Sequence, residues 1–280
     1  MPDLRITVLV ENTAGRGGLL AEHGLAFWIE RDGTRILFDT GQGDVLRHNA
    51  SRLGVDLGTA DAIVLSHGHY DHTGGLAGVL NEIGRKPVYA HPAAFEPKYA
   101  RSLDGTGRAI GVPAAGLHAA RHRADLTPVT APTEIGGGIT LTGPVPRMTD
   151  FEDTGGAFFA DPACTTPDTL PDDQAAFVET ADGTVVILGC AHAGVINTLR
   201  YVRTLTEGRP IHAVLGGMHL LNASPQRMER TVAELHLQDI GRLVPCHCTG
   251  AAAVARLWRE WPDRCQACPT GTVLTFGGAA

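Results

Sequence analysis

The sequence predicts an α/β fold in which two packed β-sheets are covered by helices on both outer faces. Short runs rich in Val, Ile, Leu and Phe alternate with turn residues over the first 90 residues. The second half repeats this order, with a hairpin followed by strand and helix units. No segment between the halves has the composition of a disordered linker, so we expect one domain over residues 1–280.

In the first half we expect strands at residues 5–10, 25–30, 35–38, 62–65 and 87–90. Asp32 and Gly33 predict a tight turn between the second and third strands, because both residue types tolerate the left-handed backbone. Residues 76–83 have helical spacing that ends at Gly84. Weak helical patterns near 93–101 and 114–122 lie within residues 92–136, which we interpret as an elaboration over the active face.

The second half is expected to begin with a strand at residues 139–142, followed by an acidic, proline-rich loop over residues 149–173 near the active site. Ser224 is the expected N-cap of one of the helices that follow. The remaining predicted strands are 174–179, 184–188, 213–215, 243–244 and 272–276, and the remaining helices are 194–206, 225–238 and 250–261.

Charge and hydropathy exclude several classes of protein. The chain has 23 basic and 30 acidic side chains, and this net charge of -7 argues against nucleic acid or an anionic membrane as the main partner. No apolar run reaches the roughly 18 residues of a membrane-spanning helix, and the first residues lack the pattern of a signal peptide. We therefore expect a cytoplasmic protein with reduced cysteines that acts on a small molecule, and a homo-oligomer is compatible with the sequence.

The strongest chemical signal is a cluster of histidines at residues 66–75, Ser-His-Gly-His-Tyr-Asp-His-Thr-Gly-Gly, which follows a predicted buried strand. His67 and His69 can bind one metal, while Asp71 and His72 point at a second site. Two-metal hydrolytic centres have their ions about 3.5–4 Å apart, a spacing that such a short loop can serve. Imidazole and carboxylate ligands together suit zinc, iron or manganese better than calcium or magnesium.

The pattern His67-x-His69-x-Asp71-His72 resembles the signature of the metallo-β-lactamase superfamily, and residues 37–41, Leu-Phe-Asp-Thr-Gly, resemble the strand and turn that precede it. The resemblance implies a four-layer αβ/βα sandwich of two mixed β-sheets with a dinuclear metal site at one edge. It extends to the branch of metal-dependent hydrolases that includes 7,8-dihydropterin-6-methyl-4-(β-D-ribofuranosyl)aminobenzene-5′-phosphate synthase. The segments that carry it are Glu11-Asn12 and residues 142–147, 172–174, 189–192, 216–220 and 246–250.

Two further histidines are expected to complete the set of metal ligands. His192 and His247 each follow a predicted strand, and strand ends that face one sheet edge can converge on a common site. The commoner family pattern has a histidine between the two halves and an aspartate that bridges both metals, and this chain has neither in that context. His192 can replace one of the missing ligands, whereas the bridging position is either empty or filled by water. Cys190 is a candidate ligand, although an apolar strand-end cysteine more often serves in packing.

Other polar residues have candidate roles around this centre. Asp39 is expected to accept the free N–H of a ligand histidine. Arg147 is the best candidate for binding a substrate phosphate, with a surface ion pair to Asp150 or Glu152 as the alternative. The cysteines at positions 246, 248, 265 and 268 have a spacing that allows a structural zinc, but reduced packing cysteines are the favoured interpretation.

These residues favour hydrolysis of an ester, lactone, amide or phosphodiester with two divalent metal ions. Zinc is the expected metal, and manganese and iron are the alternatives. Asp71 would be both a ligand and the acceptor of the water proton, and His219 would protonate the leaving group or simply hold its loop. The branch resemblance implies a competing function, a synthase that transfers a dihydropterin and binds phosphorylated or pterin-like substrates. A sulfur dioxygenase with one iron, as found in related folds, and a non-catalytic binding module also compete with hydrolysis.

Overall fold

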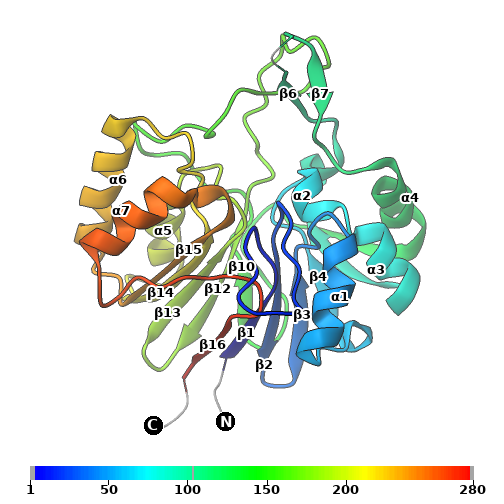
Figure 1. Ribbon diagram of the computed structural model, residues 1–280, viewed down its shortest axis with the longest axis horizontal. Coiled ribbons are helices and arrows are strands. Elements are labelled where there is room, and N and C mark those ends of the chain that lie inside the picture. Colours follow the sequence, from blue (N-terminus) through cyan, green and yellow to red (C-terminus); the bar gives the residue numbers. More distant parts are fainter. Residues whose placement is uncertain (1–3, 103, 278–280) are drawn as a thin grey trace.

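Two large β-sheets face each other at the centre of the computed structural model, which describes residues 4–102 and 104–277 (Figure 1). The strands of the first sheet are β1 Leu4–Val10, β2 Ala26–Arg31, β3 Thr34–Phe38, β4 Ala62–Val64, β5 Lys86–Ala90, β8 Ala124–Pro128 and β16 Val273–Phe276. Their order is β16-β1-β2-β3-β4-β5-β8. Strands β1 to β3 pair antiparallel, and β3, β4, β5 and β8 pair parallel, so the sheet is mixed.

The second sheet has six strands in the order β15-β14-β13-β12-β10-β9. They are β9 Thr133–Glu134, β10 Ile139–Leu141, β12 Ala175–Thr180, β13 Gly183–Leu188, β14 Ile211–Gly217 and β15 Arg242–Cys246. Strands β13, β14 and β15 run parallel, whereas β10 and β13 both pair antiparallel with β12. This sheet is therefore also mixed, as the resemblance implies.

Helices cover the outer face of each sheet (Figure 1). The helices on the first sheet are α1 Asp44–Leu53, α3 Leu76–Ile83 and α4 Ala114–Arg123, and those on the second are α5 Val195–Leu205, α6 Pro225–Gln238 and α7 Ala251–Glu260. The short helices are α2 Tyr70–Thr73, η1 Leu57–Thr59, η2 Pro92–Phe95 and η3 His247–Thr249. None of the helices in the described ranges combines the length and apolar character that crossing a lipid bilayer requires.

The core has three parts because successive strand residues point to opposite faces of a sheet. Ile36 and Phe38 of β3 meet Val185 and Ile187 of β13 in the central core between the sheets. Their neighbours on the same strands point outward and pack under the helices of each side. This packing confirms the predicted four-layer αβ/βα sandwich.

Several sequence predictions of secondary structure are accurate, and others are wrong. The hairpin turn at Asp32 and Gly33 is present with both residues left-handed, and the side chain of Ser224 caps α6 as expected. Helix α1 is absent from the predicted elements, although Gly54 ends it in the left-handed conformation that is typical of a C-cap. The helix expected near 93–101 is wrong, because η2 stops at Phe95 and residues 99–101 pair as a strand.

A small third sheet projects above the ends of the two large ones (Figure 1). Its strands are β6 Tyr99–Arg101, β7 Gly107–Ala109 and β11 Phe158–Phe159, in the order β11-β6-β7. It therefore joins the two stretches that we interpret as elaborations, residues 92–136 and 149–173. Residues 114–128 differ from that interpretation, because α4 and β8 extend the first sheet and its helical layer.

A buried ion-pair cluster fastens the small sheet to the rest of the molecule. The Lys98 Nζ atom lies 2.8 Å from Asp172 Oδ1 and 3.0 Å from Asp168 Oδ2. The other oxygen of Asp172 accepts a hydrogen bond from the Gly68 N–H at 2.7 Å. The Asp172 carboxylate thus connects the base of the small sheet with the loop that contains the predicted metal ligands.

Candidate metal centre

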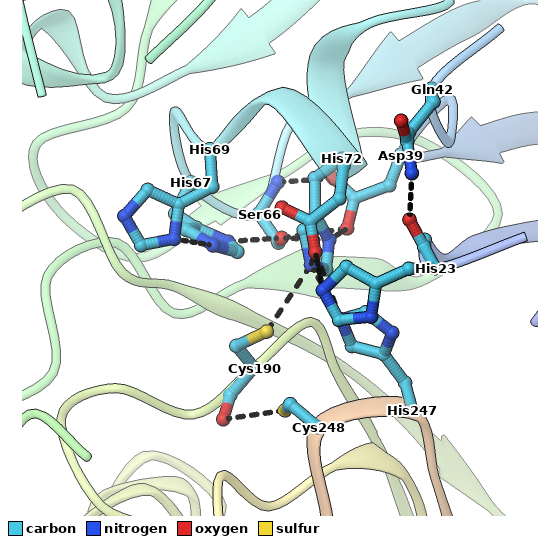
Figure 2. Close-up of polar contacts among 12 residues, drawn as sticks. His23, Asp39, Gln42, Ser66, His67, His69, His72, Cys190, His247 and Cys248 are labelled. Atoms are coloured by element: carbon cyan, nitrogen blue, oxygen red, sulfur yellow. Dashed lines mark hydrogen bonds and ion pairs between the residues drawn. The ribbon is translucent and has the colours of Figure 1, made fainter. Parts of the chain in front are cut away.

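The predicted ligands meet where the parallel strands of both sheets end. His67, His69, Asp71 and His72 follow β4, His192 follows β13, and His247 follows β15. Carboxyl ends of parallel strands lie at one edge of a sheet, and this arrangement places the loops of the two sheets against each other. Figure 2 shows side chains from these loops pointing toward a common centre.

The loop that holds the first ligands requires glycine at position 68. A Cβ atom on Gly68 would lie 2.0 Å from the Ala94 carbonyl oxygen of η2, closer than any real contact allows. Without that side chain the loop packs directly on η2, and the Gly68 N–H reaches Asp172. The packing directs His67 and His69, on either side of Gly68, into the centre, with His67 Nε2 and His69 Nδ1 3.0 Å apart.

The structure arranges the ligands in two groups of three. One donor atom from each of His67, His69 and His192 lies within 4.8 Å of the other two, and we call these residues the first triad. The second triad is Asp71, His72 and His247. Asp71 Oδ2 lies 3.3 Å from His247 Nε2 and 3.7 Å from His72 Nε2, and these two nitrogens are 3.2 Å apart.

Oxygen acceptors orient the histidine rings from behind. His72 Nδ1 donates to Asp39 Oδ2 at 2.7 Å, His247 Nδ1 donates to Asn12 Oδ1 at 2.9 Å, and His192 Nδ1 donates to the Thr154 carbonyl at 2.8 Å. Asp39 thus occupies the position that the sequence suggests for it. Metal-binding histidines in proteins are held in the same way, with the second ring nitrogen bonded to an oxygen.

The inward-facing nitrogens require a cation. When each Nδ1 carries the donated hydrogen, each neutral ring has a lone pair on Nε2. The lone pairs of His72 and His247 then face each other at 3.2 Å, an arrangement that only a proton or a metal ion between them stabilises. His192 Nε2 is buried and has no hydrogen-bond partner. The donor set therefore fits divalent metal ions such as zinc.

Burial and charge shift the pKa values of the first-triad histidines and of His72 in opposite directions. Burial lowers the pKa of His67, His69 and His192, to about 3 in the case of His69, so these rings are neutral at pH 7. Burial also acts to lower the pKa of His72, but the Asp39 and Asp71 carboxylates outweigh it and raise the pKa to about 9. Burial acts to raise the pKa of Asp71, yet the neighbouring His72 holds it well below its usual range. In the metal-free chain a proton on His72 therefore balances these carboxylates.

Unusual backbone conformations accumulate around the centre. Asp39, Ala191, His219 and His247 all have left-handed backbones, with φ between 45° and 61°. Each lies just after a strand that supplies the site. Such conformations cost about 1–3 kcal/mol each in residues with a side chain, and they persist where the surrounding structure enforces them. Their concentration here indicates a site built for function.

The two other predicted site residues, His219 and Arg147, differ in their distance from the centre. His219 lies at the edge of the first triad, with its ring centroid 4.2 Å from that of His192, and it lines the adjoining cavity. Arg147 does not line that cavity, because its guanidinium is exposed and donates to the Thr169 carbonyl. The ion-pair partners suggested for Arg147 are also engaged elsewhere, Asp150 with Arg230 and Glu152 with the N–H groups that begin α5.

The four-cysteine zinc site that the spacing allows is not formed. Cys246 and Cys268 pack in the central core, while Cys265 packs under the helices of the second sheet. Among the described residues, no group of three neighbouring metal donors includes any of these three cysteines. Cys248 instead lies near His247 and Cys190 at the candidate centre.

Sequence reasoning missed His23 and the anchors of His247. His23 Nε2 lies 3.2 Å from Asp71 Oδ2 and half of its side chain is exposed, yet it follows no strand and belongs to no ligand motif. The His247 N–H donates to Glu11 Oε1, and Asn12 holds its ring. The motif Glu11-Asn12 is recognisable in the sequence, but its partners are more than 230 positions away.

A cavity of about 840 Å³ opens beside the centre. The second triad contributes Asp71 and His247 to its wall, and the loops after β14 and β15 contribute His219 and Cys248. The small sheet adds Arg101 and Arg108, so the two arginines face the same space as the ligands. The cavity has the volume of a site for a small organic molecule.

Comparisons with known proteins agree with this geometry. A family model described as the metallo-beta-lactamase superfamily matches residues 20–247. An uncharacterised protein of Methanocaldococcus jannaschii is 36% identical over 90% of this chain and 93% of its own length. The 7,8-dihydropterin-6-methyl-4-(β-D-ribofuranosyl)-aminobenzene-5′-phosphate synthase of that organism is 26% identical over 98% of this chain and 97% of its own. Tm1679, a metal-dependent hydrolase of the β-lactamase superfamily, has a crystal structure with a TM-score of 0.84 and 32% identity, covering 98% of this chain and 100% of that one.

We expect the metal-free protein to lose stability as the pH falls from about 6.5 toward 3. In the unfolded chain His67, His69 and His192 take up protons near pH 6.5, whereas in the folded chain their pKa values are depressed, to about 3 for His69. The raised pKa of His72 acts in the opposite sense, but its contribution is complete below pH 6.5 and is lost only as the pH rises through about 9.

Urea unfolding in the presence of a chelator, repeated from pH 7 to pH 4, measures this dependence. His69→Gln should reduce the slope of the unfolding free energy by about 1.4 kcal/mol per pH unit in this window, because one titrating group is removed. His118→Gln, at an exposed position of α4, is the matched control and should keep the wild-type slope. An unchanged slope in His69→Gln would contradict the assignment.

Asp39→Asn should weaken zinc binding roughly 10–100-fold while the protein stays folded. The asparagine keeps the size of the side chain but removes the charge that holds the His72 ring and the Ser66 hydroxyl. Competition with a chromogenic chelator measures the affinity, and Asp61→Asn, which alters an exposed carboxylate on the same sheet, is the control. Equal zinc affinity in the Asp39 and Asp61 variants would show that Asp39 does not orient the ligand.

Proposed function

This chain belongs to the metallo-β-lactamase superfamily, and we propose that it is a metal-dependent hydrolase with two divalent metal ions, most readily zinc. The convergence of the two triads, with His72 Nε2 and His247 Nε2 facing each other, is the observation that carries the proposal. His67, His69 and His192 would hold one ion, and Asp71, His72 and His247 the other. When bound, such ions supply a nucleophilic water at neutral pH and neutralise negative charge that develops on the substrate.

Two side chains of the site would move protons. Asp71 would accept a proton from a bound water, because its Oδ2 atom lies within the second triad, 3.3 Å from His247 Nε2 and 3.7 Å from His72 Nε2. His219 would donate a proton to the leaving group. Burial acts to lower the pKa of His219, but the negative charge of a Cys248 thiolate outweighs it and raises the pKa above its ordinary value, which favours the protonated ring.

The cavity supports an anionic small-molecule substrate. Arg101 stacks over Phe159 with its Cζ atom 5.0 Å from the ring centroid, and the Cζ atom of Arg108 lies 5.9 Å from the centroid of Tyr70. Arg101 also donates to the Cys164 carbonyl at 2.7 Å, but both guanidiniums line the cavity, so their remaining N–H groups can bind a phosphate or carboxylate group. We therefore assign to these arginines the role that the sequence suggests for Arg147.

The relative named as a dihydropterin synthase supports a second candidate function. Its similarity extends over 98% of this chain, and a phosphorylated substrate of that class would use the same two arginines. A sulfur dioxygenase needs one iron only, and the close approach of Asp71, His72 and His247 favours two ions over one. The cytoplasmic location, the lack of nucleic-acid and membrane partners, and the oligomeric state stay predictions from the sequence.

Metal content and activity together test the proposed hydrolase. We expect about two zinc or manganese ions per chain. We also expect the purified protein to cleave at least one member of a panel of phosphodiesters and lactones. His67→Ala should lose metal, whereas His118→Ala should retain it. Asp71→Asn should lower kcat at least roughly 100-fold, the size of a lost proton-transfer group, with little change in thermal stability.

Three results would contradict the proposal or one of its parts. One iron per chain with no hydrolysis would favour sulfur oxidation instead. Equal loss of folding and activity in Asp71→Asn would remove the proposed proton-transfer role. A protein that cleaves neither phosphodiesters nor lactones, but transfers a dihydropterin to an aryl-ribose phosphate, would be the synthase.

Arg101→Gln and Arg108→Gln should each raise KM for an anionic substrate roughly 10-fold, because a charge-assisted hydrogen bond contributes about 1.5–3 kcal/mol. The KM for an uncharged ester should stay unchanged, since no anionic group is bound. Arg121→Gln, at an exposed position of α4, is the control. A larger effect of Arg147→Gln than of either cavity variant would restore the interpretation made from the sequence.

A further inference from the structure

Cys190 lies between the two triads. It follows β13, is buried, and places its Sγ atom 3.2 Å from His72 Nε2. Figure 2 shows this sulfur directed at His72, between the side of the centre that holds His67 and His69 and the side that holds His247. Its sulfur is within 4.8 Å of donor atoms of His67 and His72, and also of His192 and of His247. Cys190 thus reaches members of both triads.

The local backbone brings Cys190 against the metal loop. A Cβ atom on Gly189 would lie 2.1 Å from Ser66 Oγ, so only glycine lets the end of β13 approach this closely. The Gly189 carbonyl accepts a hydrogen bond from the Gly217 N–H at 3.0 Å, which ties the turn to the end of β14. Ala191, with φ of 52°, then reverses the chain toward His192. The conformation places both Cys190 and His192 at the centre.

Several nitrogen and oxygen atoms with lone pairs lie around the Cys190 sulfur, and few hydrogens are available to bond them. His72 Nε2, His247 Nε2 and Asp71 Oδ2 occupy the same small volume, and the buried Nε2 atom of His192 has no hydrogen-bond partner. No aspartate in residues 189–192 supplies a bridging negative charge. A divalent cation bound among these donors would deprotonate a coordinating thiol outright, so the sulfur would bind it as a thiolate.

We propose that the Cys190 thiolate is a metal ligand shared by the two triads, in place of a bridging carboxylate. The inference rests on the metal centre of the proposed function but not on hydrolysis. On metal binding the S–H bond breaks, its proton passes to the buffer, and a sulfur–metal bond forms. A thiolate is a soft ligand, so the centre should prefer zinc, cobalt or iron(II) over manganese and magnesium.

Cobalt(II) reconstitution of the full chain tests the proposal without any substrate. The wild-type protein should show a sulfur-to-cobalt charge-transfer band in the near ultraviolet. Cys190→Ser should lose this band, whereas Cys246→Ser should keep it, since Cys246 is equally buried at a strand end but belongs to no donor group. Cys248→Ser should also keep it. Loss of the band in Cys248→Ser alone, or its survival in Cys190→Ser, would overturn the assignment.

X-ray absorption at the zinc edge provides a measurement on the wild-type chain in case Cys190→Ser does not fold. A sulfur shell at about 2.3 Å, retained in Cys248→Ser, would support the proposal. A first shell of nitrogen and oxygen alone would overturn it and leave the proposed hydrolase intact. Conversely, a sulfur shell in a protein that hydrolyses nothing would refute the hydrolase and leave Cys190 as a ligand.

Discussion

The buried carboxylate of Asp39 connects the first sheet to the metal loop. One of its oxygens accepts from the Ser66 N–H, and the other accepts from the Ser66 hydroxyl and from His72 Nδ1. A carboxylate removed from water is costly unless several donors and a positive charge compensate it. His72 supplies that charge as an imidazolium in the metal-free chain. The orientation of His72, and through it the second triad, therefore depends on Asp39.

The residues of the metal centre destabilise the folded chain, although the same residues form the site that would bind metal. The first triad gathers three buried imidazoles with depressed pKa values, and four residues around the two triads have left-handed backbones. These features oppose folding unless the surrounding sheets supply the free energy, and the large central core between the sheets does so. A bound cation would also compensate the carboxylates and lone pairs that converge here. Metal binding and folding are thus expected to be coupled.

Two parts of the molecule build the walls of the cavity, the metal centre and the small sheet. The ligands come from loops at strand ends of the sandwich, whereas Arg101 and Arg108 come from the small sheet above it (Figure 1). The buried Lys98–Asp172 pair joins the two parts, because Asp172 also holds the Gly68 N–H of the metal loop. Substitutions in the small sheet can therefore change which substrate binds without changing the metal ligands. This division agrees with a fold that serves many reactions through variable elements around one site.

The sequence by itself determined what depends on neighbouring positions in the chain. The hairpin at Asp32 and Gly33, most strands and helices, and the ligands around Gly68 follow from local spacing and turn chemistry. The four-layer sandwich follows from the family resemblance that these motifs carry. Tertiary structure alone decided which strand ends share a volume. It placed His247 beside His72, 175 positions away, brought Cys190 between the triads, and set Arg101 and Arg108 rather than Arg147 at the cavity. These contacts depend on how the two sheets pack, and a one-dimensional pattern contains no measure of that packing.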